Sequence, residues 1–176
     1  MLRVQLVVNV KCLYLAYAND LYSSRVVSQI YEPLFQYHYL KRPLELIPAL
    51  AAEMPEVSED GLTHTIRIQK GVHFQDSEVF EDGKGREVTA KDFIYSWKRI
   101  ADPEVKSDGF WIFDKKIKGL NEWREKVSEG KADYETPVEG LKAVDSHTIQ
   151  IQLTQPYYQL HYVLAMSYSC VVPREA

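Results

Sequence analysis

The chain has 176 residues, of which 45% are hydrophobic and 26% are charged, and its formal net charge is −4. This is the composition of an ordinary globular protein that can bury a core. The acidic balance, with no Lys/Arg cluster interleaved with aromatic residues, argues against a nucleic-acid-binding protein. No apolar run approaches the roughly 18 residues that a membrane span needs.

The first segment predicts a strand and contains no recognisable signal peptide. Apolar residues alternate from Val4 to Val10, which favours a strand within residues 4–17. Polar residues interrupt this apolar run, and no small-residue cleavage site follows it. Lys11 directly before Cys12 also disagrees with a lipoprotein-type cleavage site.

A helix is predicted over residues 21–34. Asp20 or Ser23 is the expected N-cap, and Pro33 lies close to the expected end. The apolar face of this helix is expected to contain Val26, Val27, Ile30, Tyr31 and Leu34.

The next segment alternates between extended structure and turns. Residues 37–46 favour an extended conformation that is interrupted at Arg42-Pro43. Residues 48–54 predict one or two helical turns, because Pro48 occupies the favoured first helical position. Residues 58–61 are a turn signal, in which Gly61 supplies a positive φ.

A half-buried strand is predicted over residues 62–69, where the sequence alternates with period two. Its inward face would carry Leu62, His64, Ile66 and Ile68. We interpret His64 as a packed histidine and not a metal ligand, because no second His, Cys or acidic residue shares its spacing.

The clearest helix signal begins at Thr89. Thr89 and Asp92 have the spacing of a capping box, and Asp102-Pro103 ends the helix. The expected buried stripe consists of Phe93, Ile94, Trp97 and Ile100. The residues expected on or near the solvent side are Lys91, Lys98 and Arg99.

The elements around this helix are less regular. Residues 75–88 form a charged loop without the phosphate-loop pattern, and residues 106–111 form a second loop. A helix is expected over 119–127 and a polar linker over 128–137. A strand over 147–153, after a turn at 144–146, and a final helix from Pro156 to about Met166 complete the chain. Long irregular connections between strands predict a small mixed sheet in an α+β or α/β lobe.

The sequence does not assemble a catalytic or metal-binding site. No nucleophile-elbow pattern occurs, and Cys170 and His161 are nine residues apart on a predicted helix, so they do not share a face. The acidic pairs lie in solvated turns where nothing raises a pKa. No cofactor is therefore expected, and Cys12 and Cys170 are interpreted as unrelated free thiols, with a single disulfide as the alternative.

Several segments in a fixed order resemble one protein family. They are 30–34, 48–51, 59–68, 70–74, 88–96, 143–149 and 171–176. Over about residues 18–176 the chain resembles the family 5 extracellular solute-binding proteins, the receptors of oligopeptide and dipeptide ABC importers. It looks like an N-terminal fragment, about the first third, of these longer chains.

The resemblance implies an α/β fold, the N-terminal part of a periplasmic-binding-protein-like II fold, built as a mixed α+β lobe. Residues 1–31 would begin lobe I, residues 32–164 would form the extra domain typical of peptide binders, and residues 165–176 would return to lobe I. The implied protein is not an enzyme and has no cofactor. It captures an oligopeptide or other small solute outside the cytoplasmic membrane and delivers it to ABC permease subunits. Its implied location is periplasmic or in the cell envelope, with no nucleic-acid partner and with membrane contact only through the permease.

The resemblance also assigns candidate ligand-binding residues. Asn19 and Leu21 match positions that face the ligand in peptide-binding relatives, and Asp20 and Tyr22 are their neighbours. The matching loop of the extra domain carries Gly109, Phe110 and Trp111. Two features depart from the family. Tyr17-Ala18-Asn19-Asp20 replaces the usual Leu-Asp-Pro, and the residues that fix the termini of a peptide lie beyond Ala176.

Three alternatives remain open at this point. A signalling or partner-interaction module could use the same fold with its tyrosine-rich surface, since the chain has 12 tyrosines. The chain could be a truncated or non-functional gene product. A hydrolase would have to use Cys170 and His161.

Overall fold

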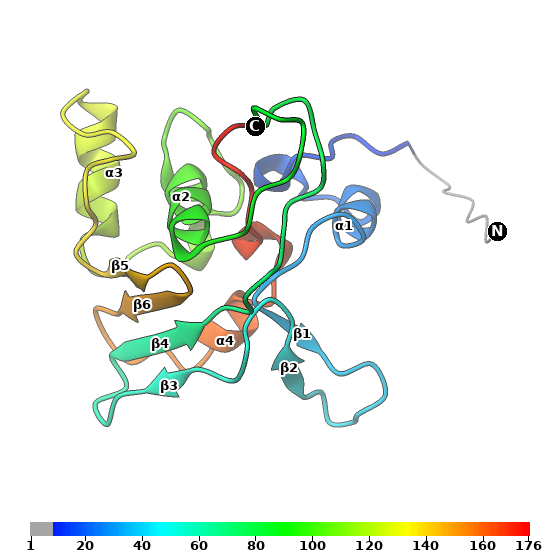
Figure 1. The fold of residues 1–176 in the computed structure, drawn as a ribbon. Helices are drawn as coiled ribbons and strands as arrows, with labels where there is room; N and C mark the ends of the chain where they lie inside the picture. The colour runs from blue at the N-terminus through cyan, green and yellow to red at the C-terminus, as the bar shows by residue number, and fades with distance from the viewer. Residues whose placement is uncertain (1–8) are drawn as a thin grey trace.

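A computed structural model describes residues 9–176 (Figure 1). Its helices are α1 (Leu21–Val27), α2 (Ala90–Ala101), α3 (Leu120–Ser128) and α4 (Leu160–Val163). Its strands are β1 (Phe35–Tyr37), β2 (Leu46–Pro48), β3 (Glu56–Val57), β4 (Thr63–Arg67), β5 (Leu141–Asp145) and β6 (Thr148–Gln152). Short 3₁₀ turns occur at Leu15–Tyr17, Phe110–Ile112 and Ser167–Ser169.

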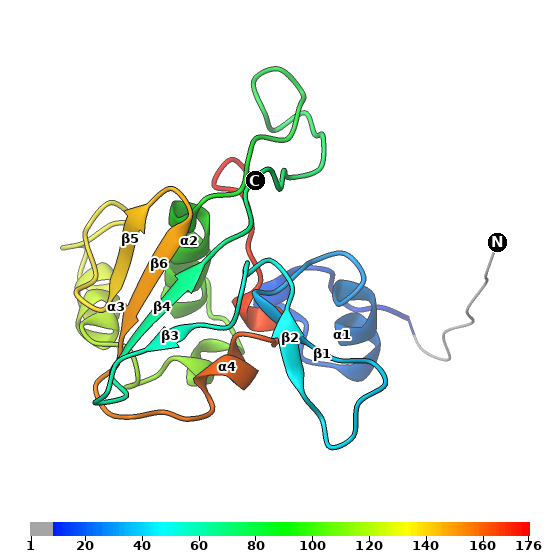
Figure 2. The same cartoon turned by 60° about the horizontal axis from the view of Figure 1, so that its bottom comes forward.

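The strands form two separate antiparallel sheets. The larger sheet has the order β3-β4-β6-β5, and β1 pairs with β2 in a two-stranded sheet. In the larger sheet Ile66 lies opposite Ile149 and His64 opposite Ile151, so the side chains at these positions face one side together. All four are buried, while the alternate positions carry threonine, glutamine and Arg67. Figure 2 shows α2 and α3 on one side of this sheet, which agrees with the predicted mixed α/β class.

Helix α2 is held at its N-terminus by a capping box, as predicted. The amide and the hydroxyl of Thr89 each donate to Oδ2 of Asp92 at 2.8 Å. Arg86 adds hydrogen bonds to both oxygens of the same carboxylate, at 2.9 and 2.6 Å. The helix ends at Ala101, because Asp102 before Pro103 adopts an extended backbone. The charge of Asp92 therefore interacts favourably with the helix dipole and also forms a partly buried ion pair with Arg86.

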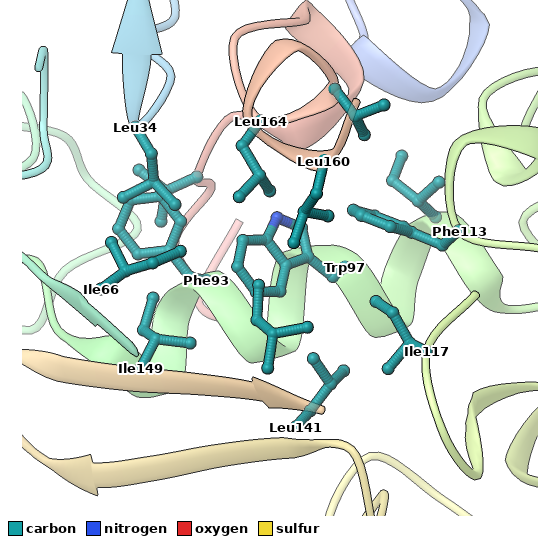
Figure 3. Close-up of a cluster of buried hydrophobic side chains, with 14 of the residues drawn as sticks. Leu34, Ile66, Phe93, Trp97, Phe113, Ile117, Leu141, Ile149, Leu160 and Leu164 are labelled. Atoms are coloured by element: carbon teal, nitrogen blue, oxygen red, sulfur yellow. The ribbon is translucent and has the colours of Figure 1, made fainter. Parts of the chain in front are cut away.

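The apolar stripe of α2 forms the centre of the core. Phe93 and Trp97 are fully buried, and Figure 3 shows Leu160 and Leu164 of the α4 segment directed at the Trp97 ring. The indole Nε1 of Trp97 donates to the carbonyl of Ser169 at 3.0 Å, which satisfies the one polar atom of that side chain. The core thus joins the sheet, α2 and the C-terminal segment.

The expectation that Lys98 faces solvent is wrong. Lys98 is 4% exposed, and its Nζ donates to the carbonyls of Tyr134 at 2.9 Å and Thr136 at 2.6 Å. The ammonium group also lies 5.3 Å from the ring centroid of Trp123. Burial lowers the pKa of Lys98. Ile94, expected in the buried stripe, is only half-buried.

The predicted helical turns over 48–54 are also wrong. Pro48 is the last residue of β2, and Ala51 forms an isolated bridge with Ile68. The amides of Ala49 and Ala51 both donate to the carbonyl of Leu34, at 2.9 and 3.0 Å. Pairing with neighbouring segments therefore uses the backbone groups that a helix would need.

The predicted lengths of the terminal elements need correction as well. Helix α1 is capped by Asp20 as expected but ends at Val27, and the chain then turns toward β1. Residues 9–13 are irregular and Leu15–Tyr17 is a 3₁₀ turn, so no strand occurs in the described part of residues 4–17. Residues 1–8 lie outside the described chain. The final helix is limited to Leu160–Val163.

The packing around Trp97 predicts that two tryptophans differ greatly in their contribution to the free energy of unfolding. Replacing Trp97 with alanine should lower the free energy of unfolding by about 3–5 kcal/mol, since it removes a fully buried aromatic side chain. Trp111 is 55% exposed. Its replacement by alanine should change stability by no more than about 0.5 kcal/mol. Urea unfolding followed by circular dichroism measures both values. Equal losses in the two variants would contradict the assigned core.

Candidate functional site

The two segments that carry the candidate ligand-binding residues lie side by side. The side-chain amide of Asn19 donates to Asp108 Oδ2 at 2.8 Å. The carbonyl of Ala16 accepts from the amide of Asp108 at 3.0 Å and from the hydroxyl of Ser107 at 3.1 Å. The Tyr17 hydroxyl donates to the carbonyl of Val105. The structure therefore brings residues 16–19 into contact with residues 105–108, although about half the chain separates them.

On the first segment, Asp20 has a structural interaction of its own. Its Oδ1 accepts from the amides of Tyr22 and Ser23, each at 3.0 Å, and it is the N-cap of α1. Hydrogen bonding from Ser23, with a smaller contribution from Tyr22, lowers the pKa of Asp20. Leu21 follows the cap and is 60% exposed, whereas Tyr22 is half-buried. The cap orients the segment and leaves Leu21 accessible.

On the second segment, each candidate residue has a different environment. Gly109 lies against Tyr168: a Cβ atom at this position would approach the Tyr168 ring to 2.4 Å. Phe110 is half-buried, with the Arg124 guanidinium 4.4 Å from its ring centroid. Trp111 points into solvent while the neighbouring Ile112 is fully buried. The loop thus anchors itself through Gly109 and Phe110 and presents Trp111.

The sequence did not point to Asp108, Val105 or Tyr168, which fix this arrangement. Asp108 accepts a hydrogen bond from Asn19, and the carbonyl of Val105 accepts one from Tyr17. Tyr168 packs closely against Gly109. None of these contacts follows a local periodic pattern. The tyrosine-rich composition was the only available signal for Tyr168.

His64 is buried as predicted, and it has a partner that the sequence did not indicate. Its Nδ1 lies 3.3 Å from Nε2 of His161 on α4, and its own Nε2 has no hydrogen-bond partner among residues 9–176. The ring of Phe35 packs at an edge of His161, with centroids 6.3 Å apart. Burial lowers the pKa of both histidines, because it disfavours the imidazolium form.

Cys170 is in a poor environment for a nucleophile. It is 2% exposed and packs with Leu15, Ala18 and Val27. Burial raises the pKa of its thiol to about 12, which keeps it protonated at neutral pH. Its hydrogen-bonding neighbour is the carbonyl of Met166, whereas His161 contacts His64. Both cysteines are free thiols.

The described residues contain neither a metal-binding cluster nor a membrane-spanning helix. Within residues 9–176, no three His, Cys, Asp or Glu side chains gather closely enough to hold a metal ion. No helix in this part of the chain combines the length and apolarity that crossing a bilayer requires.

The class of protein follows from the fold and from sequence comparison together. The sequence profile of the bacterial extracellular solute-binding proteins, family 5, matches residues 45–175. The chain therefore belongs to this family. The expected periplasmic-binding-protein-like fold is confirmed by its similarity to the solved structure of the pheromone receptor PrgZ, with a TM-score of 0.74 at 27% identity. That match covers 94% of this chain and 29% of PrgZ.

Particular relatives are peptide-binding proteins by name. The chain is 41% identical over 111 residues to the oligopeptide-binding protein AmiA of Streptococcus pneumoniae, covering 63% of this chain and 15% of AmiA. It is 32% identical over 168 residues to the periplasmic murein peptide-binding protein MppA of Escherichia coli, covering 84% of this chain and 30% of MppA. The chain thus spans less than one third of the length of these relatives.

The histidine pair predicts a specific loss of stability in acid. Both folded-state pKa values are depressed, so the pair contributes stability above the unfolded value of about 6.5. That contribution is lost as the pH falls through the folded values. Unfolding free energies measured between about pH 7.5 and 5.5 should therefore decline less steeply in His64→Gln/His161→Gln than in the unmodified chain.

The exposed His73 provides the control for this experiment. His73→Gln should keep the acid dependence of the unmodified chain, because His73 lies outside the buried pair. An unchanged acid dependence in the double variant would show that the pair does not titrate as its burial requires.

Proposed function

We propose that this chain belongs to the substrate-binding component of an ABC importer and contributes to capturing peptides outside the cytoplasmic membrane for delivery to the permease. The family assignment and the peptide-binding names of AmiA and MppA support this function. The contact between Asn19 and Asp108 is the observation that links this proposed function to particular residues. This contact joins the two segments that the family resemblance assigns to the ligand.

In this proposal some candidate residues contact the peptide, and others hold the contacting residues in position. Asn19 uses its NH₂ group on Asp108, so its side-chain carbonyl is the atom offered to a peptide N–H. Leu21 and Trp111 offer exposed apolar surface for peptide side chains. Tyr22 and Phe110, both half-buried, would line the edge of the same surface.

Asp20 and Gly109 have supporting roles in this proposal. Asp20 caps α1 and so fixes the start of the helix behind Leu21. Gly109 permits the close packing of its loop on Tyr168. Peptide receptors that pair with the main chain of the ligand tolerate varied ligand side chains.

We also propose the domain division at residues 1–31, 32–164 and 165–176. Packing at the two ends supports it, since Leu15, Ala18 and Val27 from the first part form a cluster with Cys170 from the last. The middle part contains the larger sheet, α2 and α3. The first and last parts would form the portion of lobe I that this chain contains.

The proposed function predicts a weak but specific peptide signal at Trp111. Trp97 and Trp123 are buried, so Trp111 dominates the solvent-sensitive emission. A mixed pool of short peptides should shift this emission to shorter wavelength and protect it from acrylamide quenching. Half-saturation is expected only at about micromolar to millimolar concentrations, because the chain spans less than one third of its relatives.

Trp111→Phe is the matched variant for this titration. It keeps an aromatic side chain in the loop and should abolish the peptide-dependent change. A similar change in Trp111→Phe would place the ligand elsewhere on the chain. A sub-micromolar dissociation constant measured by calorimetry would contradict the expected weak binding.

A further inference from the structure

The loop between β1 and β2 projects from the body of the molecule. Figures 1 and 2 both show it extending away from the larger sheet. Its base is fixed by the pairing of Tyr37 with Leu46 and by the bond from the amide of His38 to the carbonyl of Glu45 at 2.8 Å. Residues 39–44 form the tip, which we call the hairpin tip.

The polar groups of this loop are used within the loop itself. Nδ1 of His38 accepts from the amides of Leu40 and Lys41, at 3.2 and 3.3 Å. Lys41 pairs with Glu45 at 2.9 Å, and Nη1 of Arg42 donates to the carbonyl of Lys41 at 2.7 Å. These bonds satisfy polar groups of the tip within the loop, at solvent-exposed positions.

The apolar side chains of the hairpin tip face solvent instead. Tyr39 is 87% exposed, Leu40 77% and Leu44 54%. At the base Tyr37 packs against Tyr162 of α4, with ring centroids 6.2 Å apart, and both rings remain accessible. Single exposed apolar residues are normal on a protein surface, but a group of them on one projecting tip indicates an interaction site.

The net charge of residues 37–46 has the opposite sign to the net charge of the whole chain. Lys41 and Arg42 outnumber Glu45, so residues 37–46 carry a net charge of +1 in a chain of net charge −4. Tyrosine, leucine and basic residues side by side are the combination found where proteins meet the headgroup region of an anionic bilayer.

The size of the tip argues for a lipid surface over a protein surface. A specific protein interface needs about 20–30 residues on each side. The hairpin tip contains residues 39–44 alone and projects from the body of the molecule (Figures 1 and 2). A projecting tip that combines apolar and cationic side chains needs no matching groove when the partner is a bilayer, because the apolar side chains can enter the boundary between headgroups and acyl chains.

We propose that the hairpin tip is a peripheral contact site for anionic phospholipid membranes. Leu40 and Leu44 enter the headgroup–acyl boundary, and Tyr39 lies at the interface. Arg42 lies at the level of the lipid phosphates, and Lys41 joins it there by exchanging its ion pair with Glu45 for a phosphate. This contact is independent of peptide binding, since its residues are distinct from those of the 17–22 and 105–111 surface.

Vesicle flotation of the full chain tests this proposal. Binding to equimolar phosphatidylcholine/phosphatidylglycerol vesicles should exceed binding to pure phosphatidylcholine and should weaken as salt increases. Leu40→Ser/Leu44→Ser should lower the partition coefficient about tenfold, because two apolar side chains no longer leave water. Lys41→Gln/Arg42→Gln should reduce binding on anionic vesicles to its level on neutral ones.

Val57→Ser/Val144→Ser is the matched control. It removes two exposed valines, 45% and 60% accessible, from the edge strands β3 and β5. It should bind vesicles as the unmodified chain does. Circular dichroism should be the same for every variant, since the changed side chains are exposed. Equal partition of Leu40→Ser/Leu44→Ser and the control, or no binding of the unmodified chain to either vesicle, would overturn the proposal and leave a protein partner as the alternative.

Discussion

The burial of Trp97 is the constraint on which the rest of the structure depends. Its ring belongs to the same buried cluster as Ile66 and Ile149 of the larger sheet. Its Nε1–H donates to the carbonyl of Ser169 in the C-terminal segment. Next to it, Ser96 accepts from the amide of Val172 at 2.9 Å. Arg86 links Asp92 at the start of α2 to Glu175 at 2.7 Å. Helix α2 therefore connects the C-terminal segment to the larger sheet through the indole of Trp97, the hydroxyl of Ser96 and the guanidinium of Arg86, which Asp92 and Glu175 share.

These contacts between α2 and the C-terminal segment also position the candidate binding surface. The segment that follows α4 carries Tyr168, and the Tyr168 ring lies against Gly109 in the loop that presents Trp111. The same loop reaches residues 16–19 through Asp108 and Ser107. The path from Trp97 to these segments runs through the carbonyl of Ser169 and the packing of Tyr168 on Gly109. It involves no metal ion or disulfide among the described residues.

The sequence predicted the elements whose local pattern is strong. Strand β4 and helix α2 were recognised because their periodicity and caps are encoded within a few residues. Strand β3, by contrast, has two residues, and only pairing with β4 defines it. The burial of Lys98 depends on carbonyls 36 and 38 residues away, which no local pattern reports.

The candidate site also combines predictable and unpredictable features. The family resemblance indicates both segments, but the contact of Asn19 with Asp108 spans 89 residues and is visible only in the folded chain.

The central claim is that these two segments form one peptide-facing surface. Photo-crosslinking with short peptides that carry a benzophenone side chain, followed by mass spectrometric mapping, tests it most directly. The account predicts adducts within residues 19–22 and 109–111 of the same chain. Adducts confined to the polar face of β4 and β6, or to the β1–β2 loop, would contradict it.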